Sequence, residues 1–152
     1  METIKVLFGD PRHHTAGVHS TYVPVGIGYI ATYLSAIIPT QNFEVKISVD
    51  PDEILDLIDE WKPNILGFSS YIWNSNLSYR FCEYAKEKDD DILCILGGPE
   101  FPSGTNQTSF TETVRKECFD YLIEKSCVDY YTYSDGENAF ASIVMKYIKT
   151  GF

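Results

Sequence analysis

Basic residues are scarce in this 152-residue chain, which has 12 lysines and arginines against 22 aspartates and glutamates. The formal net charge of −10 at pH 7 repels the phosphate backbone of nucleic acids, so we expect no nucleic-acid partner. Long apolar runs are also missing, because no segment approaches the roughly 20 residues needed to cross a bilayer. The amino terminus lacks the apolar core of a secretory signal. We therefore expect a cytoplasmic protein with no membrane partner.

Close cysteine pairs are absent as well. Successive cysteines (Cys82, Cys94, Cys118 and Cys127) are 12, 24 and 9 residues apart, so no CxxC pair can form a zinc ribbon or an iron–sulfur loop. We expect these cysteines to be reduced and mostly buried. The rest of the composition is typical of a globular protein, with 44% hydrophobic and 14% aromatic residues. A chain of this size builds one core, so we predict a single domain over residues 1–152.

Two kinds of apolar pattern alternate along the chain. Short apolar runs predict buried strands at 3–8, 65–70, 92–96 and 128–133. Residues 43–49 alternate apolar and polar side chains, which is typical of an edge strand with one face more exposed than the other. Between these strands, apolar residues at three- and four-residue spacing predict helices at 26–38, 54–61, 77–85, 110–122 and 139–148.

Strict alternation of strands and helices requires right-handed crossovers and a parallel sheet with helices on both faces. We predict an α/β fold of the flavodoxin-like (Rossmann-like) type, a three-layer sandwich around a five-stranded parallel sheet in the order 2-1-3-4-5. This order places the alternating second strand at an edge and the continuous apolar strands inside. Ligands of such sheets bind beyond the carboxyl ends of the strands, near the switch point between strands one and three.

Small and hydroxyl-bearing residues gather in the loops at that edge. The loop after the first strand is long and holds all three histidines, His13, His14 and His19. Glycines let a bulky ligand approach the backbone closely, and serine hydroxyls fix its orientation. Taken singly these residues are ordinary turn formers, so their coincidence at one edge carries the prediction of a binding site. The candidates after the later strands are Ser69, Ser70 and Tyr71; Gly97, Gly98, Pro99 and Glu100; and Ser134, Gly136 and Glu137.

Four segments together resemble the amino-terminal cobalamin-binding domain of cobalamin-dependent radical S-adenosylmethionine enzymes. They are PVGIGYIATYL (24–34), NILGFSSYIWN (64–74), ILGGPEFP (95–102) and YSDGENAF (133–140). The GGPE and DGEN pieces are the most specific, and the resemblance spans essentially the whole chain. It implies a flavodoxin-like fold that holds cobalamin at the carboxyl edge of the sheet, with the nucleotide tail of the cofactor reaching down between strands.

The resemblance also implies roles for the candidate residues. Ser69 and Ser70 match the hydroxyls beside the nucleotide tail, and Gly97 and Gly98 match the glycines that make space for it. We therefore expect Gly98→Trp to abolish cobalamin binding and to leave the fold intact. Gly136 and Glu137 match the loop along the corrin or the nucleotide. The remaining implied contacts are Pro24 and Gly26 at the start of the first helix, with Tyr71, Pro99, Glu100 and Ser134.

The chain departs from related cobalamin domains at the lower cobalt ligand. Those domains carry Asp-x-His-x-x-Gly, whose histidine binds cobalt, whereas here Arg12 stands where the aspartate belongs ahead of His14. Alignment on Gly26 instead places Val23 at the histidine position. We therefore expect no metal ligand from this chain. The three histidines are interpreted as solvated loop side chains, and a contact of one of them with corrin or cobalt stays open.

The catalytic parts of the resembling enzymes are missing from this chain. A radical S-adenosylmethionine enzyme holds a 4Fe–4S cluster on CxxxCxxC, which the cysteine spacing excludes here. The resemblance therefore implies a parent enzyme whose 4Fe–4S cluster and S-adenosylmethionine are bound by a carboxyl-terminal radical domain outside these residues. This chain would carry the cofactor for methyl transfer or related chemistry without being catalytic alone.

A dinucleotide-binding domain is one alternative. Gly26, Gly28 and Ala31 satisfy GxGxxA, and Asp50 follows at the spacing of a ribose-binding acid. The pattern requires its first glycine directly after the first strand, however, and some sixteen residues intervene. A phosphoacceptor module of the same topology would need an aspartate at the end of the third strand, where Ser69 stands.

A flavin-binding domain is the other alternative. Tyr71 and Trp73 could sandwich an isoalloxazine ring. Hydroxyls in the loop after the first strand could hold a phosphate: Thr15, Ser20 and Thr21.

Overall fold

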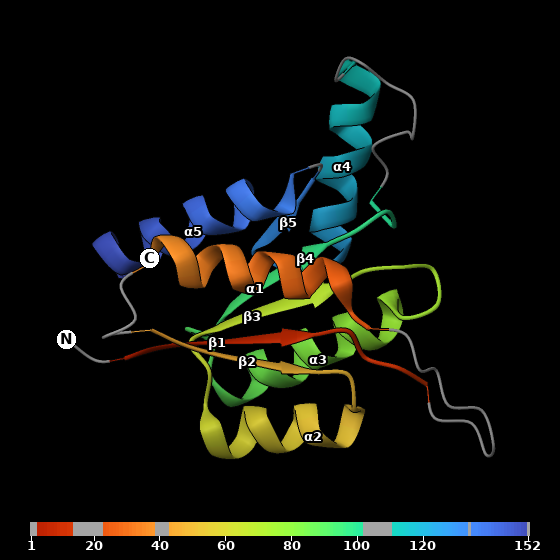
Figure 1. Ribbon diagram of the computed structural model, residues 1–152. Helices are drawn as coiled ribbons and strands as arrows, with labels where there is room; N and C mark the ends of the chain where they lie inside the picture. Colours follow the sequence, from red (N-terminus) through yellow and green to blue (C-terminus); the bar gives the residue numbers. More distant parts are fainter. Residues whose placement is uncertain (1–2, 14–22, 39–42, 102–110, 134, 152) are drawn as a thin grey trace.

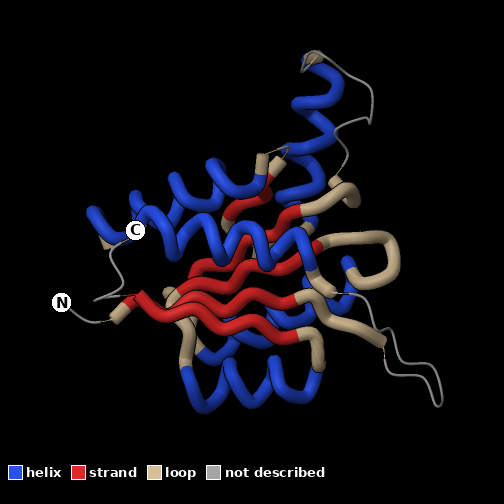
Figure 2. Tube along the Cα trace, in the orientation of Figure 1, coloured by secondary structure: helices blue, strands red, loops and turns tan. Residues whose placement is uncertain are grey.

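A five-stranded parallel sheet in the order β2-β1-β3-β4-β5 forms the centre of the computed structural model, which describes residues 3–13, 23–38, 43–101, 111–133 and 135–151. The strands are β1 (Ile4–Gly9), β2 (Phe43–Ser48), β3 (Ile65–Ser69), β4 (Leu93–Gly97) and β5 (Tyr130–Thr132). The helices are α1 (Val25–Ile37), α2 (Pro51–Asp56) with the π-helical turn η2 (Leu57–Trp61), α3 (Ser75–Lys88), α4 (Glu112–Glu124) and α5 (Gly136–Thr150). The predicted fold and strand order are confirmed, and Figures 1 and 2 show helices on both faces of the sheet.

The burial of β3 follows the hydrophobic pattern of the sequence, and the burial of β2 follows it in part. All five residues of β3 are buried, because β3 pairs with β1 on one side and β4 on the other and both of its faces are covered. In β2, Phe43 is buried and Glu44 and Lys46 are exposed as the alternation predicts, but the pattern breaks at the end of the strand, where Ile47 is exposed and Ser48 is buried. The predicted edge position of this strand is confirmed by the sheet order.

The two faces of the sheet carry separate cores because successive residues of a strand point to opposite sides. Val6 and Phe8 of β1 pack with α1 and α5, together with Phe140 of α5. Leu7, between them, packs on the opposite face with Leu66 of β3 and with α2 and α3. A third, smaller cluster of Phe101, Val114 and Cys118 holds α4 beside the second core.

The second helix ends differently from the continuous helix that the periodicity predicts. Asp50 caps its start, since the carboxylate accepts hydrogen bonds from the backbone N–H groups of Asp52 and Glu53. The last turn, η2, is π-helical and stops at Lys62, which has a φ of 53°. Pro63 explains this ending, because the residue before a proline is kept out of the α region.

The four cysteines are free, with Cys82, Cys94 and Cys118 buried and Cys127 half-buried. Among the described residues, none of the helices combines the length and the apolar character that a membrane crossing requires.

Candidate functional site

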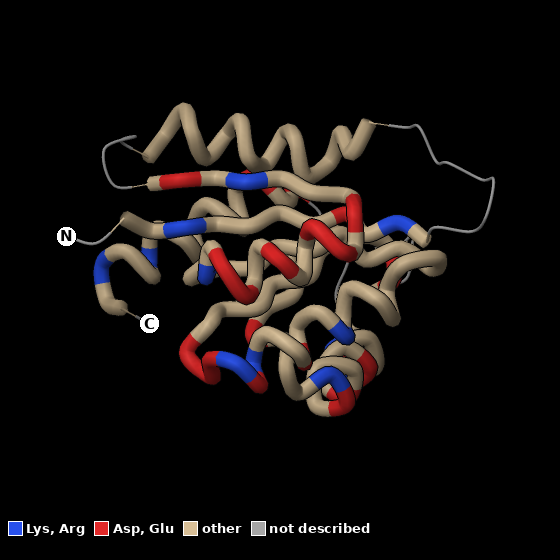
Figure 3. Tube along the Cα trace, turned by 90° about the horizontal axis from the view of Figure 1, so that it is seen from below, with Lys and Arg blue, Asp and Glu red and all other residues tan. Residues whose placement is uncertain are grey.

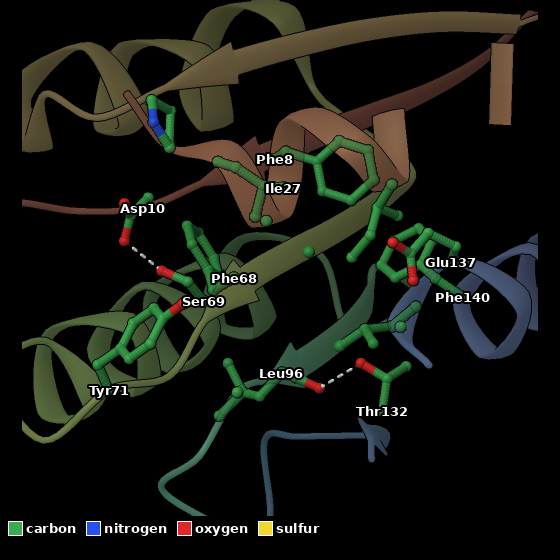
Figure 4. Close-up of a pocket in the computed structure, with 18 of the residues that line it drawn as sticks. Phe8, Asp10, Ile27, Phe68, Ser69, Tyr71, Leu96, Thr132, Glu137 and Phe140 are labelled. Atoms are coloured by element: carbon green, nitrogen blue, oxygen red, sulfur yellow. Dashed lines mark hydrogen bonds between the residues drawn. The ribbon is translucent and has the colours of Figure 1, made fainter. Parts of the chain in front are cut away.

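A cavity of about 260 Å³ opens at the carboxyl edge of the sheet, between β1, β3, β4 and β5 and the first turns of α1 and α5 (Figure 4). It lies on the α1 and α5 side of the sheet. The polar or glycine lining residues are Asp10, Gly26, Gly67, Ser69, Gly97, Gly98, Thr132, Gly136 and Glu137, and the others are Phe8, Pro24, Val25, Ile27, Ile30, Phe68, Tyr71, Ile95, Leu96 and Phe140.

The strand order explains the position of this cavity. The chain leaves β1 toward β2 on one side and β3 follows on the other side of β1, so the loops after β1 and β3 diverge and leave a crevice. The sequence placed a ligand site at this switch point, and the cavity lies there.

Glycines determine the depth of the cavity. A Cβ at Gly67 would lie 2.7 Å from the Phe140 ring and 2.8 Å from the Phe8 ring, and these two rings lie 4.8 Å apart by centroid. The missing side chain at Gly67 thus lets two aromatic rings close the bottom of the cavity against the sheet. At the side, a Cβ at Gly97 would overlap Oγ1 of Thr132.

A buried hydrogen-bond network forms the polar wall between β1 and β3. Asp10 is the first residue after β1, and its Oδ1 accepts hydrogen bonds from the Ser69 hydroxyl and from Nδ2 of Asn74, the latter at 2.9 Å. Oδ1 of Asn74 in turn accepts from the Tyr71 backbone N–H at 2.8 Å. The hydroxyl of Ser78 donates to the carbonyl oxygen of Ser69 at 2.8 Å. These bonds fix the Asp10 carboxylate at the cavity edge (Figure 4).

The charge of the cavity is negative. Asp10 and Glu137 are its ionisable acids, and no lysine or arginine is among the lining residues that the structure describes. The Thr132 hydroxyl is committed to the Leu96 carbonyl oxygen at 3.3 Å. The side chains of the wall therefore offer mainly hydrogen-bond acceptors, which suit hydroxyl and amide donors of a ligand.

The structure brings together most of the residues that the sequence singled out. Pro24, Gly26, Ser69, Tyr71, Gly97, Gly98, Gly136 and Glu137 line the cavity. Ser70, Pro99 and Glu100 are not among the lining residues, and Ser134 lies outside the described residues. Strand alternation separates the two serines, because Ser69 faces the cavity side and Ser70 is buried toward the opposite side.

Gly98 has a structural role that the sequence did not indicate. Its φ of +136° is one that residues other than glycine rarely adopt, and a Cβ there would lie 3.1 Å from the backbone nitrogen and carbonyl carbon of Ser70. A tryptophan at this position would disturb the β3 and β4 loops themselves. The expectation that this substitution leaves the fold intact is therefore not supported by the geometry.

Sequence reasoning missed several lining residues that shape the cavity, among them Asp10, Gly67, Thr132 and Phe140. A signal existed for Asp10, since it is the polar residue directly after the first apolar strand. Phe140 gave none beyond its place in the helical periodicity. Its contact with the cavity depends on Gly67, which lies far away in the sequence.

The histidines provide no metal site among the described residues. His13 is exposed, and its Nε2 donates to the Trp73 carbonyl oxygen at 2.8 Å, which joins the loops after β1 and β3. His14 and His19 lie outside the described residues. In the described part of the chain, no group of three or more histidine, cysteine, aspartate or glutamate side chains is placed to hold a metal ion.

The features proposed for nucleotides are arranged differently from what those ligands need. The rings of Tyr71 and Trp73 stack on each other, with centroids 4.6 Å apart and planes at 4°, so nothing is sandwiched between them. Gly26 and Gly28 lie within α1 rather than in a tight turn after β1. The hydroxyls proposed for a flavin phosphate, Thr15, Ser20 and Thr21, are outside the described residues.

An aromatic cluster supports the far side of the Gly97–Gly98 loop. Phe101 stacks on Tyr131 at 4.2 Å, and the Tyr131 hydroxyl donates to the Gly98 carbonyl oxygen at 2.9 Å. Burial raises the pKa of Tyr131 well above its ordinary value, so this donor keeps its proton at neutral pH.

Two curated relatives are much longer than this chain. An anaerobic magnesium-protoporphyrin IX monomethyl ester cyclase of Rubrivivax gelatinosus is 29% identical over 100 residues, which are 62% of this chain and 18% of that protein. A 2-(S-pantetheinyl)-carbapenam-3-carboxylate methyltransferase of Streptantibioticus cattleyicolor is 23% identical over 133 residues, which are 82% of this chain and 17% of that protein. The chain therefore spans less than a fifth of either relative.

Solved structures share the fold. A cobalamin-binding protein from Desulfitobacterium hafniense DCB-2 has a TM-score of 0.59 at 17% identity, covering 95% of this chain and 58% of that chain. A CheY-like receiver domain from Methanospirillum hungatei JF-1 has a TM-score of 0.56 at 12% identity, covering 97% and 96%. Such likeness shows the fold alone, because two different functions share it. The profile of the B12 binding domain family, however, matches residues 14–144, which is most of the sequence, and the chain therefore belongs to this family of cobalamin-binding domains.

Proposed function

We propose that this chain positions cobalamin for a radical S-adenosylmethionine catalytic domain in a longer enzyme, and that the cavity receives the nucleotide tail of the cofactor. The observation that carries the proposal is the glycine-bottomed cavity at the switch point of a B12 binding domain. When bound, cobalamin supplies organometallic cobalt chemistry such as methyl transfer. The part of this chain is to bind and orient.

The size and lining of the cavity fit a part of the cofactor. Sites that enclose a whole drug-sized ligand measure roughly 300 to 1,000 Å³, and this cavity of about 260 Å³ is somewhat smaller. It suits an aromatic base and its sugar, with the corrin left at the edge of the sheet. The Phe8 and Phe140 rings would pack against the base, and the acceptors Asp10 and Glu137 would bind hydroxyl or amide donors.

The chain's own residues would hold this arrangement rigidly. Asp10 is fixed by Ser69 and Asn74, so its orientation does not depend on a ligand. The positive φ of Gly98 turns the chain at the end of β4, and the Tyr131 hydroxyl holds that turn from behind. A site prepared in this way loses little conformational entropy when a ligand binds.

The proposed catalytic partner rests on the sequence resemblance and on the relatives. GGPE and DGEN resemble motifs of the radical enzymes. Both relatives are enzymes, and each is more than five times as long as the segment that matches this chain. One of them is named a methyltransferase, which agrees with methyl transfer as the reaction class. In such an enzyme the 4Fe–4S cluster and S-adenosylmethionine would belong to the other domain.

An anaerobic titration of the purified chain with hydroxocobalamin and methylcobalamin tests the proposal. We expect cobalamin to co-elute with the protein on gel filtration. We expect its ultraviolet–visible spectrum to be of the base-off type, because the tail would be detached from cobalt and inserted in the cavity. Binding of flavin with no binding of cobalamin would contradict the proposal and favour the flavodoxin-like alternative.

Two glycines of α1 provide a matched pair of variants for the site. A Cβ at Gly26 or at Gly28 would have nothing within 4 Å, yet only Gly26 lines the cavity. We expect Gly26→Phe to reduce cobalamin retention and Gly28→Phe to leave it unchanged. Equal retention by both variants would place the tail elsewhere.

A further inference from the structure

The first helix differs from the other helices in its charge. The 13 residues of α1 include no acidic or basic side chain, although the chain as a whole has a net charge of −10. Figure 3 shows this helix between two grey segments with no red or blue along it. The other four helices all carry charged residues. A surface helix normally presents charged residues to solvent, whereas the exposed Thr32 and Ser35 of α1 donate their hydroxyls to carbonyl oxygens of the helix itself, so its surface is unusually apolar.

The outer face of α1 carries an apolar stripe, which we define as the residues at four-residue spacing Val25, Tyr29, Tyr33 and Ile37. Their exposed fractions are 52%, 63%, 36% and 40% in that order. Side chains four residues apart on a helix are neighbours, so these four form one continuous row along its length. A continuous row of large apolar side chains is the usual sign of an interaction surface.

Helix α4 shows that exposure alone is not the distinguishing feature. Its Phe119 and Ile123 are 65% and 60% exposed, which matches the stripe on α1. They are interspersed with charged residues such as Glu117, Asp120 and Glu124, so a partner would have to desolvate these charges. The stripe on α1 lacks that obstacle.

We propose that the apolar stripe of α1 is the docking surface for the catalytic domain of the same polypeptide, a proposal that rests on the proposed function for the existence of that domain. Helix α5 packs along α1 on the same face of the sheet, so a catalytic domain that follows α5 in the polypeptide would start from the layer that carries the stripe. The matched span is less than a fifth of either relative, which leaves ample chain to cover one helix.

The stripe also adjoins the cofactor site. Val25 is both its first residue and a lining residue of the cavity. A domain seated on the stripe would therefore stand at the mouth of the cavity, where a catalytic partner must be to reach the cofactor. Because α1 offers no charge, the matching face of the partner should be apolar, with an acceptor or donor for the Tyr29 hydroxyl, whereas the Tyr33 hydroxyl already donates to Oδ1 of Asn138 at 2.8 Å.

Hydrogen–deuterium exchange of the whole gene product and of the 152-residue chain tests the docking. In the whole protein we expect the amides of α1 (25–37) to exchange at least about tenfold more slowly than in the shorter chain. The amides of α4 (112–124) should exchange alike in both. Equal exchange of α1 in the two proteins would overturn the proposal. So would protection of α1 that grows with the concentration of the shorter chain, because the occupant would then be a second copy.

Charged variants supply the control. In the whole protein, Tyr29→Glu should return α1 exchange to the rate of the shorter chain, whereas Phe119→Glu, equally exposed, should not. Circular dichroism of the shorter chain reports whether Tyr29→Glu folds. If it does not, Ile37→Glu at the far end of the stripe takes its place as the test variant. No effect of a folded stripe variant would contradict the docking.

Cobalamin retention by the 152-residue chain separates the two proposals. Protection of α1 without cobalamin binding would leave the docking in place and remove the cofactor role. Cobalamin binding without protection of α1 would do the reverse.

Discussion

The Asp10 network makes a quantitative prediction about stability. Ser69→Ala removes one of the two donors to Oδ1 of a buried carboxylate, leaving Nδ2 of Asn74 at 2.9 Å. Hydrogen bonds to charged groups contribute about 1.5–3 kcal/mol, and neutral ones about 0.5–1.5 kcal/mol. Ser78→Ala is the control, since Ser78 is also buried and donates to a peptide carbonyl at 2.8 Å. Ser69→Ala should therefore lower the free energy of unfolding by about 2–3 kcal/mol and Ser78→Ala by about 1 kcal/mol.

Urea unfolding followed by circular dichroism measures both variants. With a slope of about 2 kcal/mol per molar urea, the midpoint should fall by about 1–1.5 M for Ser69→Ala and about 0.5 M for Ser78→Ala. The slopes should stay unchanged, because neither substitution alters the area exposed on unfolding. An equal or smaller loss for Ser69→Ala would refute the reasoning, since the hydrogen bond to Asp10 would then contribute no more than one to a peptide group.

Three further predictions concern the cavity and its surroundings. Asp10→Asn keeps an acceptor for the Ser69 and Asn74 donors but replaces the second carboxylate oxygen with an N–H donor. Cobalamin affinity in the gel-filtration titration should therefore fall by about 5- to 100-fold, which corresponds to about 1–3 kcal/mol. Unchanged affinity would mean that Asp10 has a structural role alone. Gly98→Ala should destabilise the fold by about 1–3 kcal/mol in urea because of its positive φ, whereas Gly26→Ala should cost nothing. Burial raises the pKa of Tyr131 above the value near 10 of the unfolded chain, so the contribution of Tyr131 to stability should be constant below about pH 10 and fall above it. Tyr131→Phe should therefore make the fall of the urea midpoint between about pH 8 and 11 shallower than in the unchanged chain.

The fold was predictable because its signals are local. Each strand is a short run that reads as apolar or alternating by itself, and Asp50 with Pro51 marks a helix start in two residues. Once five such strands alternate with helices, few topologies remain, and the edge character of β2 selects among them. The π-helical turn before Lys62 was not predictable, because periodicity does not distinguish a widened last turn from an ordinary one.

The candidate site was predictable in location but only partly in composition. The carboxyl ends of the strands gave its place, yet Ser69 and Ser70 read alike in the sequence and only the strand geometry assigns one to each face. The partnership of Gly67 with Phe140 joins β3 to α5 across a long sequence separation, and a single sequence carries no trace of such a pair. Loop residues of the site can be predicted from their place after the strands, whereas residues at the bottom of the cavity depend on packing between distant segments.

The two faces of the sheet have different roles, because one is filled with large side chains and the other holds the cavity. Toward α2 and α3 the strands bury large apolar side chains, such as Leu66 and Phe68 of β3, and no cavity lining comes from those helices. Toward α1 and α5, β3 has Gly67, which has no side chain to pack on that face, and the cavity lies there. The uncharged helix α1 lies over this less filled face, and one of its residues, Val25, belongs to both the cavity and the apolar stripe. A ligand that enters the cavity therefore contacts the helix whose outer surface we assign to the catalytic domain, so occupancy of the site and docking on α1 would be sensed through the same element.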